Sequence, residues 1–265
     1  TSVDPTEVSH FNALASSWWD PHGPSRLLHL MNPLRHTFIS RCRANIASPD
    51  AAAKLRYLDI GCGGGIFAES AARLQGTASV VGIDPTPEVL RIAEAHRRRD
   101  PVLVMPGRLT YLNVAIENLS TAAAGAAGAD TSSQHRKDAA LPTFDIVTIF
   151  EVLEHVSTPS PFLTLAMQHV KPGGWLVLST IARTWTSWLV TNVVAEDVLG
   201  IVPKGTHDWG KYVNEHELRS WFLERGWGRL GSDMRAMGVV YLPGLGWREV
   251  GGSEGWGNYF FGVRR

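Results

Sequence analysis

The sequence has 265 residues, 44% of them hydrophobic, which is enough to bury a substantial core and excludes a chain that is disordered throughout. Its 25 basic and 25 acidic residues give a formal net charge of zero, so no nucleic-acid partner is expected. Two cysteines make neither a disulfide framework nor a thiolate zinc site, and the sequence lacks the apolar run of about 18 residues that spans a bilayer.

Two helices are predicted before residue 50. The first has Asp4 as its N-cap, Pro5 at the first helical position and Glu7 three residues after the cap. Its apolar side chains share one stripe, formed by Val8, Phe11, Leu14, Ala15 and Trp18. The second helix is expected after Asn32-Pro33, over about residues 34–46.

From residue 55, short apolar segments alternate with helical patterns, which is typical of a parallel sheet with helices on both faces. Strands are expected at 56–60, 79–84, 109–114, 144–150, 174–181, 235–242 and 257–264. Helices are expected at 65–74, 86–98, 160–170 and 214–225. The pattern predicts an α/β, Rossmann-like fold with a mostly parallel seven-stranded sheet. Residues 121–142, rich in Ala, Gly and Ser, are predicted to be a flexible insertion.

A glycine-rich turn, Gly61-Cys62-Gly63-Gly64-Gly65, follows the first of these strands. Glycines permit a sharp turn and the close approach of backbone to a ligand, and the alternative is a tight turn that binds nothing. A dinucleotide site would have a further glycine at position 66, where this chain has Ile66, and Asp59 would repel a pyrophosphate. Both residues suit S-adenosylmethionine (SAM), a cationic ligand that carries an amino acid, with Gly61 and Gly63 closest to it.

Two further positions are expected to contact this cofactor. Asp84 ends the second strand about twenty residues beyond the glycines, the distance at which an acidic residue accepts hydrogen bonds from ribose hydroxyls. An aspartate at a strand end often only caps the next helix, but Thr86-Pro87 already supplies that cap. Asn113 and Val114 end the third strand and are placed beside the adenine by position alone.

Five segments, spread from residue 11 to residue 208, carry a resemblance to a known family. They are FNALASSWWD (11–20), LMNPLR (30–35), LDIGCGGG (58–65), EVLEH (151–155) and VPKGTHD (202–208). In these segments the chain resembles the ubiquinone biosynthesis O-methyltransferases of the eukaryotic mitochondrial type, within the class I SAM-dependent methyltransferases. The glycine turn is common to many methyltransferases, whereas the WWD, NPLR and PKGTHD segments are far more specific.

The resemblance implies the cofactor contacts Arg35, Gly61, Asp84 and Phe150, the last in a position where relatives often have Met. A guanidinium at position 35 can clamp the methionine carboxylate, although a surface arginine is the alternative. The implied substrates are polyprenylated catechols and demethylubiquinol. The implied location is the matrix side of the mitochondrial inner membrane, in a complex with other ubiquinone-biosynthesis proteins, although this chain shows no targeting segment.

Glu151, Glu154 and His155 are the predicted catalytic residues, because methyl transfer to a catechol needs a deprotonated hydroxyl. If a helix begins directly after the fourth strand, their spacing puts them on one face, where they could hold a divalent metal. Magnesium is expected, with zinc or manganese as alternatives. Otherwise His155 positions the substrate or acts as a general base, and His207 is a second base candidate.

The domain organisation predicted from these elements has three parts. Residues 1–50 would supply helices that cover the active site, and residues 51–265 the SAM-binding domain. Residues 184–208 would form a lid, whose apolar part at 184–202 could meet the membrane as a peripheral contact or simply pack on the core. Rival readings are a methyltransferase for another small phenol, a non-catalytic SAM-binding subunit and a nicotinamide-dependent oxidoreductase.

Overall fold

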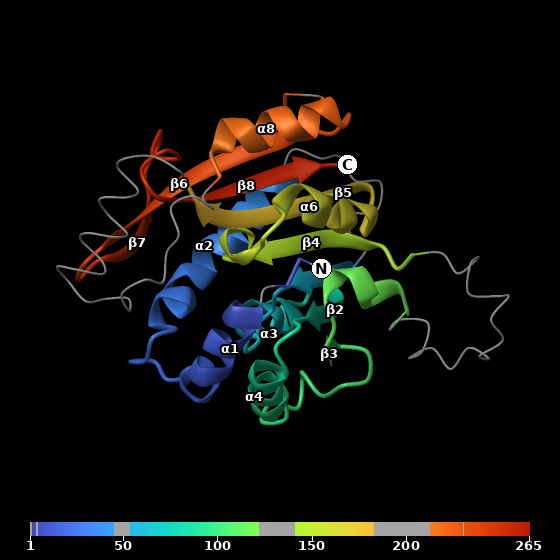
Figure 1. The fold of residues 1–265 in the computed structure, drawn as a ribbon, viewed down its shortest axis with the longest axis vertical. Helices are drawn as coiled ribbons and strands as arrows, with labels where there is room; N and C mark the ends of the chain where they lie inside the picture. Colours follow the sequence, from blue (N-terminus) through green and yellow to red (C-terminus); the bar gives the residue numbers. More distant parts are fainter. Residues whose placement is uncertain (1, 4, 45–53, 122–140, 183–212, 230) are drawn as a thin grey trace, which may run out of the picture.

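The computed structural model describes residues 2–3, 5–44, 54–121, 141–182, 213–229 and 231–265. An eight-stranded sheet with the order β3-β2-β1-β4-β5-β8-β6-β7 runs through the molecule (Figure 1). The strands are β1 (Leu55–Ile60), β2 (Thr77–Ile83), β3 (Leu109–Leu112), β4 (Phe144–Phe150), β5 (Val170–Ile181), β6 (Met234–Leu242), β7 (Gly246–Glu249) and β8 (Asn258–Arg264). The first five are parallel, and β8 lies antiparallel between β5 and β6.

All seven strands predicted from the sequence are present, and the antiparallel edge strand β7 adds an eighth. It was missed because it is four residues long, begins at a glycine and lies in a stretch rich in turn-forming residues. The expected mostly parallel α/β architecture is therefore confirmed, with β6, β7 and β8 as its antiparallel part.

Helices cover both faces of the sheet. They are α1 (Pro5–Leu14), α2 (Arg26–Arg43), α3 (Ile66–Arg73), α4 (Pro87–Arg97), α6 (Pro159–Gln168) and α8 (Glu215–Glu224), with short 3-10 turns η1 (Ala15–Ser17), η2 (Ile116–Asn118) and η4 (Leu153–His155). On β5, Trp175 and Val177 pack with α2, α3 and α4, whereas Leu176 and Leu178 pack with α6 and α8. This alternation gives the molecule two cores, one on each face of the sheet.

Helix α2 begins at Arg26, well before the predicted start at residue 34, and it contains Pro33. The proline was taken as a helix start because it removes a backbone donor from a helix interior. Tertiary packing outweighs this preference, because the buried residues Met31 and Phe38 lie on both sides of the proline and belong to one core cluster. The structure therefore places Arg35 in the middle of a long helix rather than at its beginning.

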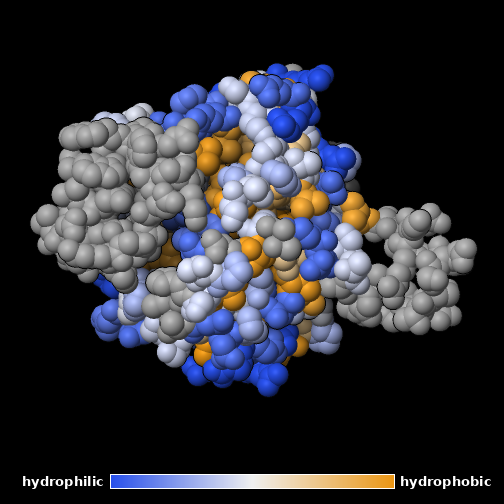
Figure 2. All heavy atoms as spheres, in the orientation of Figure 1, coloured by the Kyte–Doolittle hydropathy of each residue, from blue (hydrophilic) through white to orange (hydrophobic). Residues whose placement is uncertain are grey.

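Several predicted features lie outside the described residues. These are the N-cap Asp4, residues 122–140 of the predicted insertion, and residues 183–212, which contain the predicted lid and His207. None of the described helices is long and apolar enough to cross a membrane. On the face seen in Figure 2, apolar residues appear as separate patches among polar ones.

Candidate active site

A cavity of about 280 Å³ opens at the carboxyl ends of β1, β2 and β4, the edge at which a parallel α/β sheet binds ligands. Of the ten site residues predicted from the sequence, nine line it: Arg35, Asp59, Gly61, Gly63, Asp84, Phe150, Glu151, Glu154 and His155. The tenth, Asn113, is not among the lining residues, and its side-chain amide donates to the carbonyl of Asp84 at 2.9 Å. Beyond β3 the lining continues instead with Val114, Ala115 and Ile116.

The glycine turn is shaped by left-handed backbone and by a tryptophan that lies against it. Gly61, Gly63 and Gly65 have φ angles of 70°, 52° and 88°, which side-chain-bearing residues rarely adopt. A Cβ on Gly63 would lie 2.4 Å from the ring of Trp18, and one on Gly64 would lie 2.2 Å from it. The turn therefore needs glycine both for its backbone and to admit the indole of Trp18.

Two buried carboxylates flank this turn. Asp84 accepts hydrogen bonds from the backbone N–H groups of Gly63 (2.9 Å) and Thr86 (2.8 Å), and Asp59 accepts one from the Thr148 hydroxyl at 2.7 Å. Burial raises the pKa of Asp59 to about 7, and the hydrogen bond from Thr148 opposes this rise. Burial also raises the pKa of Asp84. Two carboxylates held out of water favour a positively charged ligand at this end of the cavity.

Arg35 is buried, with 4% of its surface exposed, so the alternative of a surface arginine is wrong. Its guanidinium carbon lies 4.9 Å from the centre of the Phe150 ring. Among the residues that the structure describes, its Nε has no hydrogen-bond partner. Burial lowers the pKa of Arg35, and the negative charges of Glu151 and Asp59 oppose the change. A buried guanidinium with an unused donor on a cavity wall is suited to bind a ligand carboxylate.

The predicted helix directly after β4 is wrong. Glu151 has a left-handed backbone, with φ 55°, and only the three-residue turn η4 follows it. The Glu151 N–H donates to the carbonyl of Ser179 at 3.1 Å, so the chain stays tied to β5 at the position where the helix was expected to begin. The one-face spacing on which the metal prediction depended is therefore absent.

The three predicted metal ligands also have separate partners. Glu151 accepts hydrogen bonds from the Ser179 hydroxyl (2.6 Å) and the Asn258 amide (3.1 Å), and Glu154 accepts one from the Thr180 hydroxyl at 2.8 Å. Within the described ranges, no three His, Cys, Asp or Glu side chains are grouped so that they could hold a metal ion. The three-ligand site predicted from the sequence is therefore not present in this arrangement.

Glu151 and Glu154 nevertheless interact electrostatically. Burial and the negative charge of Glu154 raise the pKa of Glu151 to about 7, while the hydrogen bond from Ser179 opposes the rise. Both carboxylates line the cavity. A cation between them would relieve their repulsion, and hard divalent ions favour carboxylate oxygens.

His155 contacts Glu7, a residue that the sequence analysis assigned only to the start of a helix. Its Nδ1 lies 3.0 Å from a carboxylate oxygen of Glu7, and its ring meets Phe11 edge-on with centroids 5.2 Å apart. Burial lowers the pKa of His155, but the hydrogen bond to Glu7 and the charge of Glu154 outweigh it, so the pKa lies above its ordinary value. Glu7 also lines the cavity. No local pattern signals this contact, because 148 positions separate the two residues.

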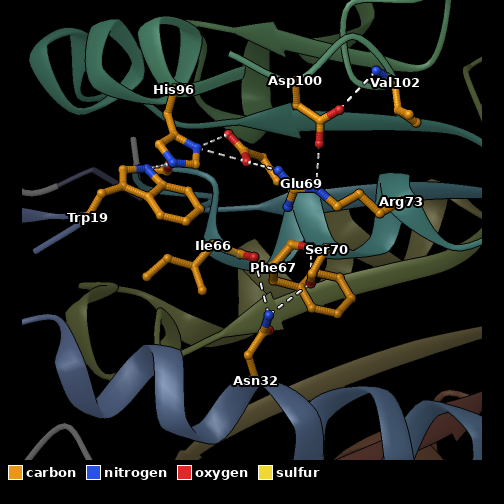
Figure 3. Close-up of polar contacts among 11 residues, drawn as sticks. Trp19, Asn32, Ile66, Phe67, Glu69, Ser70, Arg73, His96, Asp100 and Val102 are labelled. Carbon is orange, nitrogen blue, oxygen red and sulfur yellow. Dashed lines mark hydrogen bonds and ion pairs between the residues drawn. The ribbon is translucent and has the colours of Figure 1, made fainter. Parts of the chain in front are cut away.

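The N-terminal segment that carries Glu7 is fastened beside the glycine turn. The indole N–H of Trp19 donates to the carbonyl of Gly64 at 2.9 Å. Figure 3 shows the Trp19 ring stacked on His96, with centroids 3.5 Å apart and planes within 5°. His96 in turn bonds Glu69, a fully buried carboxylate of α3, at 2.9 Å. The segment is thus joined to both α3 and α4, which contribute Ile66 and Val89 to the lining of the cavity.

Comparison with known proteins identifies the domain type. The family described as "Methyltransferase domain" matches residues 8–228. A mitochondrial ubiquinone biosynthesis O-methyltransferase of Schizosaccharomyces pombe is 43% identical over 270 residues, covering 100% of this chain and 87% of that protein. The protein with the same description from Candida albicans is 38% identical over 305 residues, covering 100% and 86%.

Solved structures with the same fold are methyltransferases. Magnesium protoporphyrin IX methyltransferase from Synechocystis, with bound S-adenosylhomocysteine (SAH), has a TM-score of 0.63 at 15% identity and covers 99% of this chain and 100% of that one. A plantazolicin methyltransferase with SAH has a TM-score of 0.58 at 16% identity, covering 98% and 96%. The expected class I methyltransferase fold is confirmed, and the full-length relatives show that this chain is a SAM-dependent O-methyltransferase that belongs to the ubiquinone biosynthesis O-methyltransferase family.

Proposed function

We propose that this chain transfers the methyl group of SAM to a catechol-type hydroxyl of polyprenylated ubiquinone precursors, namely polyprenyl dihydroxybenzoate and demethylubiquinol. The observation that carries the proposal is one cavity lined by two sets of groups. The first set is a glycine turn, a buried guanidinium and two buried carboxylates, and the second is His155 with the carboxylates of Glu151 and Glu154. The descriptions of the relatives support the substrate class.

The first set of groups suits each part of SAM. Arg35 would bind the methionine carboxylate and Asp59 the ammonium group, because each supplies the opposite charge in a buried position. Asp84 would accept hydrogen bonds from the ribose hydroxyls. Gly61 and Gly63 leave room for the ligand to approach the backbone.

In the second set, His155 would act as the general base. The hydroxyl oxygen of the catechol attacks the methyl carbon, the carbon–sulfur bond breaks, and its electron pair stays on sulfur to give SAH. The hydroxyl proton moves to the imidazole. A raised pKa makes His155 a stronger base than an ordinary imidazole, which helps because a phenol has a pKa near 10.

We also propose a divalent metal, but held by Glu151 and Glu154 rather than by three ligands, because the helix that would bring His155 to the same face is absent. The support is the chemistry of this pair, in which burial and the negative charge of Glu154 raise the pKa of Glu151. Magnesium often binds through one or two carboxylates and completes its coordination with substrate and water; manganese and zinc are alternatives. Bound there, the ion would supply positive charge that lowers the pKa of the acceptor hydroxyl.

We propose a mitochondrial location, supported by the descriptions of the eukaryotic relatives. The matrix side of the inner membrane, a peripheral contact through residues 184–202 and association with other ubiquinone-biosynthesis proteins rest on the family resemblance. The polyprenyl tail gives these proposals a physical reason, since a substrate of that kind resides in the bilayer.

A transfer assay tests the proposed function. The purified protein, supplied with labelled SAM and magnesium, should methylate a short-chain prenyl dihydroxybenzoate and demethylubiquinol, and plain catechol much less. A preference for plain catechol would favour the alternative of a methyltransferase for another small phenol. Transfer to none of them, with SAH still bound, would leave a non-catalytic SAM-binding subunit.

A further inference from the structure

The contact between Glu7 and His155 joins the N-terminal helix to the turn after β4. Both side chains are partly exposed, at 28% and 22%, and both line the cavity. An ion pair with this exposure typically adds only about 0–1 kcal/mol to folding stability. The pair with His155 therefore contributes little to folding stability, and its effect on the imidazole is the more informative property.

A carboxylate bonded to one nitrogen of an imidazole decides which nitrogen carries the proton and which faces the reaction. Nδ1 of His155 lies 3.0 Å from Glu7, so Nε2 is the ring nitrogen that this carboxylate does not engage. The ring of Phe11 meets the imidazole edge-on, with an interplanar angle of 82°, and limits its rotation. Glu7 and Phe11 both belong to α1, so one helix holds the histidine in two ways.

The helix that supplies these contacts is itself held in place. The residues after α1 pack Trp18 against the glycine turn and stack Trp19 on His96 (Figure 3). The carboxylate of Glu7 therefore has a defined position relative to the glycine turn. A positioning residue needs this property, because small displacements of a catalytic group reduce its effect strongly.

We propose that Glu7 is a positioning residue of the active site, which orients His155 so that Nε2 faces the acceptor hydroxyl. The N-terminal helix is then a functional part of the site as well as its cover. The proposal rests on the proposed function for the role of His155 in methyl transfer, but the orientation of the imidazole can be measured without that reaction.

The test compares Glu7→Gln and Glu7→Asp with the matched control Glu88→Gln, a surface carboxylate of α4 paired with Arg91. Glu7→Gln should lower kcat for a prenyl dihydroxybenzoate about 10- to 100-fold, because a misplacement of about 1 Å at the reaction centre can cost roughly 100-fold in rate. The KM for SAM and the Kd for SAH should change less than about twofold, within the scatter of a single weak contact. Glu7→Asp should recover part of the loss, and Glu88→Gln should match the wild type.

A second readout separates this proposal from the proposed function. In ¹⁵N NMR of histidine-labelled protein with SAH bound, the Nδ1 signal of His155 should shift in Glu7→Gln and stay in Glu88→Gln. An unchanged signal, or an unchanged kcat, would overturn the positioning role. A loss of SAH affinity as large as the loss of kcat would also overturn it, because it would show that the substitution disturbs the structure of α1. If the wild type methylates no catechol, the proposed function fails, and the NMR comparison still decides whether Glu7 orients His155.

Discussion

Buried charge in this molecule is concentrated at the cavity. In the described part of the chain, the buried Arg, Asp and Glu side chains are Arg35, Asp59, Glu69, Asp84 and Glu154. All but Glu69 line the cavity. Because moving a charged group out of water is costly, a site that collects such groups is organised to interact with a charged ligand rather than to stabilise the fold.

We expect the affinity for SAM to depend on pH through the ionisation of Asp59. Its pKa of about 7 means that near pH 6 most of the free protein carries a protonated Asp59. The ammonium group of SAM favours the ionised form, so binding should release a proton, and affinity should rise from about pH 6 to pH 8. Calorimetry in phosphate and in Tris should give different apparent enthalpies for the wild type. Asp59→Asn should lose this difference and Glu151→Gln should keep it; no buffer effect in the wild type would contradict the assignment.

Arg35 should contribute to cofactor affinity only by binding the carboxylate of the cofactor. Arg35→Lys loses the planar pair of donors, which should weaken SAH binding by about 1.5–3 kcal/mol, the range for hydrogen bonds to a charged group. The binding of 5′-methylthioadenosine, which lacks the amino-acid group, should be almost unaffected. Titration of both ligands into both proteins measures the coupling directly. Equal losses for the two ligands would show instead that the substitution disturbs the fold of α2.

At the scale of elements, apolar patterning predicted the strands well because each buried strand is a short apolar run between turn residues. The runs that became β1 and β4, for example, begin and end within a residue of the predicted positions. The same reasoning failed where long-range packing decides. Pro33 was read as a helix start although it lies inside α2, and the turn at Glu151 was read as a helix.

In the candidate site as well, local patterns predicted some residues, whereas contacts between distant segments were missed. Glycine spacing and strand ends brought Asp59, Gly61 and Asp84 to one cavity, because the ends of parallel strands meet at one edge. Contacts between distant segments were beyond a reading of local spacing. Glu7 was assigned only to a helix start, and the closeness of Trp18 to Gly63 carried no local signal.

The turn after β4 should make the reaction dependent on a divalent ion. A chelator should abolish methyl transfer to a catechol, because it removes the ion proposed to lie between Glu151 and Glu154. Added magnesium should restore the transfer. Glu154→Gln should lose the response to magnesium while its SAH affinity in calorimetry stays near that of the wild type, since the ion serves the acceptor. Full activity in excess chelator would remove the metal from the mechanism and leave His155 as the only group that activates the hydroxyl.

The anchoring of the N-terminal segment can be tested at Trp19. Trp19→Ala removes the stacking on His96 and the hydrogen bond to Gly64, which together are worth about 1–3 kcal/mol. The amides of α1 should then exchange with deuterium roughly 5- to 150-fold faster, as this free energy implies, while those of β1 and β4 are unchanged. Trp256→Ala is the control, because Trp256 is 53% exposed. Unchanged exchange in α1 would mean that other contacts hold the segment.

The proposed substrate resides in a membrane, whereas no described helix is suited to cross a bilayer. On the face shown in Figure 2, apolar residues form separate patches among polar ones. We proposed membrane contact for residues 184–202, which lie outside the described residues and whose composition is strongly apolar. This assignment depends on the sequence and the family resemblance.

Liposome binding tests this assignment. The wild type should sediment with liposomes, and Trp185→Glu combined with Trp188→Glu should reduce sedimentation, because tryptophan favours the headgroup region and glutamate does not. Turnover of a long-tailed substrate should fall with it, while turnover of a short-tailed analogue should persist. Equal losses on the two substrates, with liposome binding retained, would point to a segment that only supports the fold.

The N-terminal segment also affects the order of events in a catalytic cycle. Trp18 lies against the glycine turn, and Glu7 and Phe11 lie beside His155 on the same segment. All three residues line the cavity, so an outward displacement of this one segment would open the wall beside the glycine turn and beside His155 together. In the proposed reaction, SAH and the methylated product would then leave by the same opening, and their departure would add to the length of each turnover.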